Sequence, residues 1–379
     1  MEITDIAGVY CSGIKEKKLG LGIVKCSGSV AGVFTQNKIK AAPVIVCREN
    51  ISDGYIRGII VNSGNANAYT GEQGIKDAGE MCRMAAKLFG CDARDIAVAS
   101  TGVIGRRLDV EWIRAKAPEV FADLGNTTIH ADKFAKSIVT TDKFVKKAYS
   151  EKVGIAAVAK GAGMIAPNMA TMLCFIFTSA KFDSGELYEM LKNAVDASFN
   201  RLTVDGDTST NDTVLLVSTG KERVDAGLFE EELERVCYSL AKKIAMDGEG
   251  ATRVFEVFVE GAASDEDAYR IARTVADSLL VKTAIFGRDP NWGRIIAAVG
   301  YSGADVDERI TLSFESDINR ILLVDRGKPA GSEKDARELL ERSKELTIRI
   351  KLEKGRGEGF AIGCDLSYDY VKLNADYTT

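Results

Sequence analysis

Apolar and polar side chains alternate without interruption between residues 346 and 352. The apolar members of this run are Leu346, Ile348, Ile350 and Leu352, and the residues between them are polar or charged. A period of two places successive side chains on opposite faces of a strand. The stretch 309–314 shows the same alternation. We therefore expect strands with one buried face in the last quarter of the chain.

Helical periodicity is interleaved with such strands. Residues 74–89 carry apolar side chains on one face, which is typical of an amphipathic helix. Further helices are predicted over 108–124, from a capping pair at Asp183 and Glu186 onward, over 228–246 and over 265–280. Short apolar runs predict strands over 30–34, 43–47 and 58–61. Because helices and strands do not alternate strictly, we expect a layered α/β fold of the mixed α+β type rather than a doubly wound parallel sheet.

The composition excludes several classes of protein. Of the 379 residues 46% are hydrophobic, and the net charge is −5, so the chain can bury a core and has no basic excess for nucleic acid. No apolar stretch approaches the roughly 20 residues of a membrane span, and the first residues do not resemble a secretion signal. The eight cysteines stand singly, without a C-x-x-C pair. We expect a cytoplasmic protein that uses no metal, nucleic acid or membrane.

The chain contains one histidine, His130. A catalytic site that needs an imidazole base would have to use it, and a zinc hydrolase with two or three histidine ligands cannot be built. A polar stretch follows His130, so we expect it at the surface or at the start of a helix. Any catalysis by this chain therefore needs a different base.

Residues 160–173 join a glycine-rich turn to an apolar run, with Thr171 at the junction. The first interpretation is that Thr171 is an ordinary β-branched residue at the start of a buried strand. The second is that the bond between Ala170 and Thr171 breaks by attack of the Thr171 hydroxyl on the Ala170 carbonyl. The freed α-amine would then be the base, since its ordinary pKa is near 8. The pattern alone favours the first interpretation.

Several motifs resemble, in order, the ornithine acetyltransferase family, also called glutamate N-acetyltransferases, some of which are bifunctional. They are residues 33–35 with 41–43, 61–68 (Val-Asn-Ser-Gly-Asn-Ala-Asn-Ala), 100–105 (Ser-Thr-Gly-Val-Ile-Gly), 160–173, 205–212 (Asp-Gly-Asp-Thr-Ser-Thr-Asn-Asp), 288–294 and 374–379. They span essentially the whole chain. The resemblance favours the second interpretation of Thr171, because that family cuts itself before the threonine of an Ala-Thr-Met-Leu run.

The resemblance also implies roles for individual residues. Thr171 would be the nucleophile and, after the cut, would supply its α-amine as the base, while Thr101 and Gly102 would form the oxyanion hole. The substrate-binding residues implied are Thr140 or Thr141, Lys160, Thr171 itself, Glu249, Asn374 and Thr379. Lys160 can hold a carboxylate, and Glu249 can pair with the ornithine ammonium. The choice between Thr140 and Thr141 stays open.

The implied reaction moves an acetyl group from N2-acetyl-L-ornithine to L-glutamate, through an ester on Thr171, in arginine biosynthesis. The implied fold is an α/β/β/α-type sandwich with a smaller C-terminal α/β lobe from about residue 260. Residues 1–170 would form an α chain and 171–379 a β chain, assembled as two of each. No cofactor is implied, and whether acetyl-coenzyme A also serves as an acetyl donor stays open.

Two other functions use the same sequence features. A self-processed aminopeptidase or amidase would share the Thr171 chemistry but pass the acyl group to water. A non-enzymatic amino-acid-binding protein on this scaffold would leave the chain intact. Acetate release and chain cleavage distinguish these functions from an acetyltransferase.

Overall fold

The computed structural model describes residues 1–166 and 172–376. The predictions for Ala170, Thr171 and Thr379 fall outside these ranges. The chain forms two compact units. Within the described ranges, the first contains residues 1–200 and 207–244, and the second contains residues 201–206 and 245–376.

The first unit is built on one sheet, whose described strands run in the order β4-β3-β2-β8-β7-β6-β5, with β1 also paired to β2. Their bounds are β1 Tyr10–Glu16, β2 Leu19–Phe34, β3 Tyr55–Asn65, β4 Ile96–Val103, β5 Lys146–Ser150, β6 Ile155–Lys160, β7 Leu173–Ala180 and β8 Thr213–Glu222. The long strand β2 pairs with β1 and β3 along its first part and with β8 along its last part. It therefore joins two halves of the sheet.

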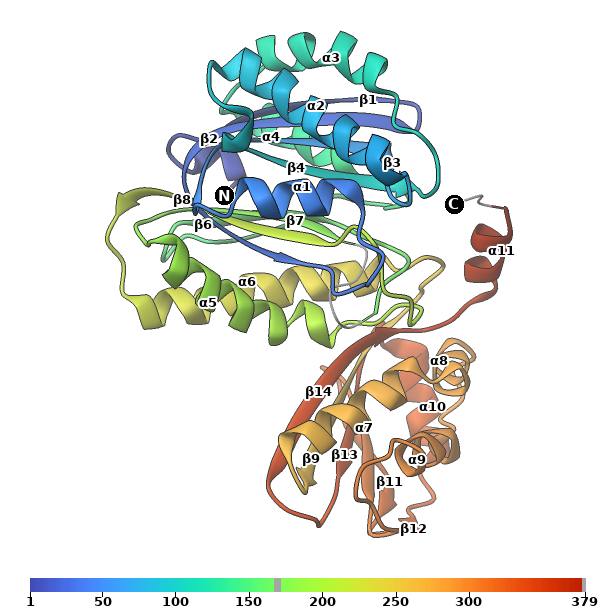
Figure 1. The fold of residues 1–379 in the computed structure, drawn as a ribbon. Coiled ribbons are helices and arrows are strands. Elements are labelled where there is room, and N and C mark those ends of the chain that lie inside the picture. Colours follow the sequence, from blue (N-terminus) through green and yellow to red (C-terminus); the bar gives the residue numbers. More distant parts are fainter. Residues whose placement is uncertain (167–171, 377–379) are drawn as a thin grey trace. The chain divides into compact units, whose positions relative to one another are not determined.

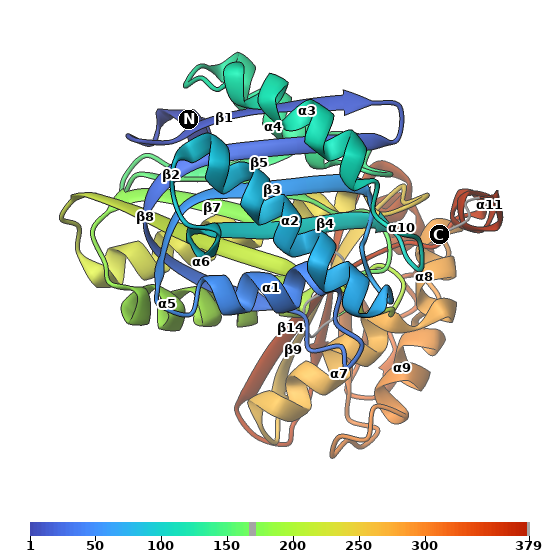
Figure 2. The ribbon, with the colours of Figure 1, turned by 45° about the horizontal axis from the view of Figure 1, so that its top comes forward.

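Helices cover the outer side of each half. Figure 1 shows α2 and α3 on one side of β1–β4, and α5 and α6 on the far side of β6–β8. In Figure 2, α2 crosses β3 and β4. The helices of this unit are α1 Ala42–Asn50, α2 Gly71–Phe89, α3 Val110–Ala122, α4 Thr128–Ile138, α5 Ser184–Asp196 and α6 Ala226–Met246, with short 3₁₀ turns at Ile3–Asp5 and Ala93–Asp95. One hydrophobic core contacts both halves of the sheet, and in it Phe134 of α4 packs edge-on against Phe175 of β7.

The second unit has its own sheet, whose described strands run in the order β12-β11-β10-β13-β9-β14. The strands are β9 Val254–Ala262, β10 Thr311–Glu315, β11 Arg320–Asp325, β12 Lys328–Pro329, β13 Glu345–Lys351 and β14 Gly357–Cys364. The helices are α7 Asp265–Asp277, α8 Leu279–Phe286, α9 Trp292–Gly300, α10 Glu333–Arg342 and α11 Tyr368–Asp376, and a 3₁₀ turn spans Phe199–Arg201 between the units. The alternation at 346–352 is confirmed as β13, whose apolar side chains are buried.

The mixed α/β prediction is confirmed, and so are most of its elements. Asp183 caps α5 and Glu186 completes its capping box. The prediction of a strand over 43–47 is wrong, because these residues lie in α1. Pro43 occupies one of its first positions, where a missing N–H costs nothing. The predicted helix over 265–280 is in fact α7 followed by α8, because Ser278 starts a new helix by accepting from Val281 N–H.

Candidate active site

Thr101 and Lys160 meet in the interior of the first unit. Thr101 lies near the end of β4, Lys160 ends β6, and each residue is only 2% exposed. Lys160 Nζ donates a hydrogen bond of 3.1 Å to Thr101 Oγ1. A hydroxyl that accepts from an ammonium keeps its own O–H for another acceptor. The pair can thus offer a polarised donor to a developing negative oxygen.

Gly102 follows Thr101 at a position where only glycine fits. Its φ is +132°, and a Cβ there would lie 2.3 Å from the carbonyl carbon of Gly64. The register between β3 and β4 shifts at Asn65, next to this contact. Such irregularities change the direction of backbone groups at the end of a strand. A backbone N–H beside the Thr101 hydroxyl is the second donor that an oxyanion hole needs.

Asp142 links the loop before β5 to the end of β6. Its buried carboxylate accepts from Lys146 Nζ at 2.6 Å and from Gly161 N–H at 2.7 Å. Burial raises the pKa of Asp142, but the ammonium groups of Lys160 and Lys146 and the hydrogen bonds outweigh it, and the pKa falls to about 2. Asp142 is therefore ionised at neutral pH.

Lys15 of β1 extends this group of charges. Its Nζ donates to Ser63 Oγ at 2.7 Å and to the Val139 carbonyl at 2.5 Å. Burial and the nearby Lys160 ammonium lower the pKa of Lys15 to about 8, while Asp142 acts in the opposite direction. Lys15 is still mostly charged at pH 7.

Lys15, Lys146, Lys160 and Asp142 together form what we name the lysine cluster. Three ammonium groups and one carboxylate give it a formal charge of +2 at pH 7. Positive charge in a partly dry site attracts anions, and a carboxylate is one that lysine ammonium groups bind through charge-assisted hydrogen bonds. The lysine cluster therefore suits a ligand that carries a carboxylate.

Asp212 lies where β7 and β8 begin, beside Met172. Its Oδ1 accepts from Met172 N–H at 2.9 Å, and Thr213 N–H donates to the Met172 carbonyl at 3.1 Å. Asp212 is fully buried, and within the described residues its Oδ2 has no hydrogen-bond partner. Burial raises the pKa of Asp212 well above its usual range, although the Met172 N–H, the Lys160 ammonium and hydrogen bonds with the Ser209 and Thr35 side chains act against it.

The two candidate threonines lie in the loop between α4 and β5. Thr140 N–H donates to Asp142 Oδ2 at 3.0 Å, so Thr140 contacts the lysine cluster through its backbone. Thr141 is half-buried in the same loop. The contact distinguishes the two residues but does not involve the Thr140 side chain.

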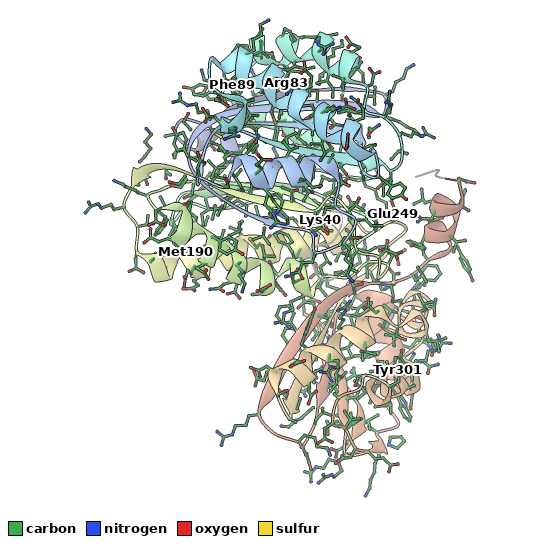
Figure 3. All side chains as sticks on the ribbon, viewed as in Figure 1. Lys40, Arg83, Phe89, Met190, Glu249 and Tyr301 are labelled. Atoms are coloured by element: carbon green, nitrogen blue, oxygen red, sulfur yellow. The ribbon has the colours of Figure 1, made fainter. Side chains whose placement is uncertain are left out.

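Glu249 and Asn374 come together in the second unit. Glu249, labelled in Figure 3, lies in the turn after α6, and Asn374 lies in α11. Asn374 Nδ2 donates to Glu249 Oε2 at 3.0 Å. A carboxylate held in this way keeps lone pairs for a cationic ligand.

Sequence reasoning missed Lys15, Lys146, Asp142 and Asp212 as site residues. Their positions in the sequence could have identified two of them. Asp142 directly follows the candidate Thr141, and Asp212 is the last residue of the 205–212 motif. Lys15 and Lys146 had no local signal, because only the pairing of strands brings them near Lys160.

His130 lies in the first turn of α4, as expected for a helix start, and its Nδ1 lies 2.8 Å from Thr127 Oγ1. All eight cysteines are free thiols, and all except Cys91 are buried. Across the two described ranges, no three His, Cys, Asp or Glu side chains gather as a metal site would need. No helix in those ranges is both long and apolar enough to cross a membrane.

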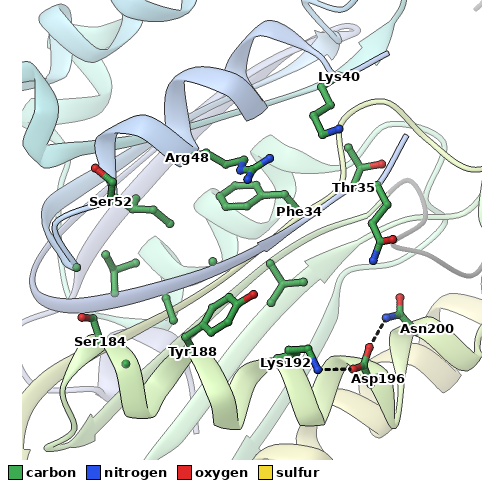
Figure 4. Close-up of a pocket in the computed structure, with 18 residues that line it drawn as sticks. Phe34, Thr35, Lys40, Arg48, Ser52, Ser184, Tyr188, Lys192, Asp196 and Asn200 are labelled. Carbon is green, nitrogen blue, oxygen red and sulfur yellow. Dashed lines mark hydrogen bonds and ion pairs between the residues drawn. The ribbon is translucent and has the colours of Figure 1, made fainter. Parts of the chain in front are cut away.

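A groove of about 690 Å³ runs along the last part of β2, between α1 and α5 (Figure 4). Arg48 and Lys40 line it on one side and Tyr188 on the other. Lys192 pairs with Asp196 at its rim. None of its lining residues belongs to the lysine cluster or to the Thr101 pair.

Comparisons with known proteins agree over the whole chain. A family model described as the ArgJ family matches residues 6–379. An arginine biosynthesis bifunctional protein ArgJ of Archaeoglobus fulgidus is 73% identical over 379 residues, covering 100% of both chains. A glutamate N-acetyltransferase of Methanosarcina mazei is 48% identical over 388 residues, covering 100% of this chain and 98% of that protein.

A crystal structure of an arginine biosynthesis bifunctional protein ArgJ from Bacillus halodurans is also similar. It is 43% identical, with a TM-score of 0.50. The match covers 98% of that solved chain but only 54% of this one.

Proposed function

The chain belongs to the ArgJ family of ornithine/glutamate acetyltransferases of arginine biosynthesis, and on that premise we propose that it carries acetyl groups on Thr171. The bond between Ala170 and Thr171 is first broken by the chain itself. Thr171 then takes the acetyl group of N2-acetyl-L-ornithine, ornithine leaves, and the amine of L-glutamate takes the acetyl group from the ester. The products are ornithine and N-acetyl-L-glutamate.

The observation that carries this proposal is the buried hydrogen bond from Lys160 to Thr101. In the pairing of β6 with β7, Lys160 stands opposite Leu173. Leu173 follows Thr171 by two residues in the sequence. The donor pair therefore lies at the end of the sheet where β7 begins, and Met172, which follows the proposed nucleophile in the sequence, directly precedes β7.

Thr101 and Gly102 are proposed as the oxyanion hole. The Thr101 hydroxyl, which accepts from Lys160, and the Gly102 N–H would both donate to the oxygen of the tetrahedral intermediate. Loss of one such donor typically costs about 3 to 4 kcal/mol of barrier.

The α-amine of Thr171 is proposed as the base. His130, the single imidazole, is engaged with Thr127 at the start of α4. A terminal amine has an ordinary pKa near 8 and can take the hydroxyl proton at neutral pH. That proton passes to the leaving ornithine amine when the C–N bond breaks.

The lysine cluster is proposed to bind the carboxylate shared by both substrates. Its charge supports this role for Lys160, and Thr140 is the threonine in contact with the cluster. Glu249 and Asn374 are proposed to bind the side-chain ammonium of ornithine, and Thr379 and Thr141 remain proposed substrate contacts. No cofactor is proposed, and acetyl-coenzyme A remains open as a second donor.

The extent of the Bacillus halodurans match supports self-cleavage. Nearly all of that solved chain corresponds to slightly over half of this one. The proposed fragment from Thr171 to Thr379 is also slightly over half of the chain. We propose that the two fragments stay together in the cytoplasm as an assembly of two α and two β chains.

Denaturing gel electrophoresis with N-terminal sequencing tests the cut. Purified protein should give two fragments, the second beginning at Thr171. Thr171→Ala should stay as one chain and lose transfer. An intact wild-type chain with full activity would contradict the proposal.

Incubation with N-acetylornithine and glutamate tests the reaction. An acetyltransferase yields N-acetylglutamate and ornithine in equal amounts. Release of acetate at the same rate with and without glutamate would instead identify an amidase.

A further inference from the structure

The last part of β2 is paired along one edge only. Its residues from Ser29 to Phe34 pair with β8, whereas its pairing with β3 ends at Ser29. Just beyond that end, Val30 N–H donates to the Gly54 carbonyl at 2.9 Å. Within the described residues, no strand pairs with residues 31–34 on the side that faces away from β8. This part of β2 is therefore a free sheet edge.

The alternation of hydrogen bonds decides which backbone groups face the free edge. Thr35 N–H donates to the Asp212 carbonyl on the β8 side, whereas Val30 N–H points to the other side. Successive residues of an antiparallel strand bond to opposite sides, so Gly32 and Phe34 have the orientation of Val30. The N–H and C=O groups of Gly32 and Phe34 therefore face the free edge, where a further strand could pair with them.

The groove of Figure 4 runs along this edge. Gly32 and Phe34 line it, the end of α1 borders it with Arg48 and Ile51, and α5 borders it with Tyr188. All of its lining residues belong to the first unit. A strand added to a sheet points its side chains alternately to two opposite faces. A groove with a helix on either side of an open edge has the shape that such a strand needs.

The charges of the groove indicate what kind of strand it suits. Its cationic side chains are Lys40, Arg48 and Lys192. Among the lining residues the one carboxylate is Asp196, which pairs with Lys192 at 3.3 Å, so the formal charge is +2. Lys40 Nζ donates to the Asn37 carbonyl, which leaves its charge unpaired by that contact. The groove therefore suits an anionic occupant.

The same charges argue against a second copy of this chain in the groove. Pairing of one β2 edge with the same edge of another copy would bring two grooves of charge +2 together. Like charges placed opposite each other across paired strands are destabilising. An acidic partner is favoured instead.

We propose that the free edge of β2 is a docking site for an extended acidic segment of another protein, which adds to the sheet as a further strand. Its backbone pairs with Gly32 and Phe34, and its carboxylates bind Arg48 and Lys40. In this mode of recognition main-chain hydrogen bonds supply affinity and side-chain contacts supply specificity. The inference goes beyond acetyl transfer and does not depend on it.

A synthetic peptide tests the docking. The probe is a fluorescein-labelled, amidated peptide of about six alternating valine and glutamate residues, since valine favours an extended chain. Fluorescence anisotropy at low salt measures its binding to the full-length protein, and we expect a Kd below about 1 mM. The same peptide with lysine in place of glutamate should not bind. Absence of binding by the acidic peptide, or equal binding by the basic one, overturns the inference.

N-methylation of the peptide tests the strand pairing. A peptide methylated on every second amide keeps one edge that can pair, and it should bind nearly as well as the parent peptide. A peptide methylated on every amide has no such edge and should bind at least about 10-fold more weakly. Equal binding by the two methylated peptides would show that charge alone attracts the peptide, and the proposed strand would be wrong.

Arg48→Glu tests the role of charge on the protein side. It should weaken peptide binding by roughly 10-fold or more and leave acetyl transfer unchanged. Lys87→Glu is the matched control, because Lys87 is also exposed and also lies in the last turn of its helix, α2, but does not line the groove. It should change neither binding nor transfer. Equal binding by Arg48→Glu and Lys87→Glu contradicts the proposal.

Amide hydrogen exchange, followed by NMR, distinguishes a partner segment from a second copy. In the protein alone, the Gly32 and Phe34 amides should exchange faster than the Val33 amide, which faces β8. The acidic peptide should slow both of them. Slow exchange of both amides without peptide would mean that a second copy already covers the edge, and unchanged exchange with bound peptide would place the peptide elsewhere. Either result rules out the proposed docking.

Discussion

Lys160 Nζ and Thr101 Oγ1 share a buried hydrogen bond, although β4 is one edge of the sheet and β6 lies next to the other edge. The bond exists because β2 joins two halves of the sheet that bring these strand ends together. Their contact gives Thr101 a polarised hydroxyl.

Thr101→Val should lower kcat/KM for N-acetylornithine by about 100-fold to 1000-fold, because valine keeps the shape of threonine but cannot donate to the oxyanion. Steady-state kinetics measures the change. Thr101→Ser is the control, since it retains the hydroxyl and should lose far less. Equal losses in the two variants would argue against a hydrogen-bonding role.

Gly102→Ala should destabilise the fold by more than about 2 kcal/mol, because a Cβ at φ +132° meets the backbone of Gly64 at 2.3 Å. Urea unfolding measures the change. Gly79→Ala is the matched control in α2, where only the end of the flexible Arg83 side chain is near. That variant should gain about 0.5 to 1 kcal/mol from helix propensity.

Asp142→Asn should destabilise the protein at pH 7 by about 2 to 3 kcal/mol, because the variant loses the ionised partner of Lys146. The pKa of Asp142 in the folded protein is about 2, below its ordinary value of 3.8. The unfolded chain thus binds the proton more readily between pH 4 and pH 2. The stabilisation of the folded protein by ionised Asp142 is therefore fully present above pH 4 and is lost as the pH falls to about 2.

Urea unfolding of the wild type and of Asp142→Asn at several pH values between 7 and 2 tests whether this contribution is lost on acidification. The difference in free energy of unfolding between the two proteins should shrink on acidification. A difference that stays constant from pH 7 to pH 2 would show that the charge of Asp142 is not the cause.

Lys15→Met should raise KM for both N-acetylornithine and glutamate by about 10-fold, with a smaller change in kcat, because one positive charge of the lysine cluster is lost. Lys192→Met, in the groove of Figure 4, removes an exposed lysine outside the cluster and should change neither constant. A KM effect on only one substrate would contradict a site for the carboxylate common to both.

Glu249→Gln should raise KM for N-acetylornithine about 10-fold and leave KM for glutamate nearly unchanged, because only ornithine carries a side-chain ammonium. Steady-state assays with each substrate varied in turn measure this ratio. Asn374→Ala should cause a smaller change in the same direction, since Asn374 holds Glu249 through one hydrogen bond.

The sequence alone determined the family resemblance, the mixed α/β class, the strand at 346–352 and the absence of a usable imidazole. Each of these follows from local pattern or from residue counts. Local pattern failed at 43–47, where a five-residue apolar run with β-branched side chains suits a strand or a helix equally. Packing against α2 and β4 decided for the helix α1.

Only the tertiary structure decided which polar residues share one site. Lys15 and Thr101 come from β1 and β4 in one half of the sheet, Asp142 comes from a loop, and Lys160 comes from β6 in the other half. Strand order and register, rather than spacing along the chain, bring their charges within interacting distance. The same is true of Asp212, whose buried carboxyl becomes notable only when β8 is paired with β7 and Met172 lies beside it.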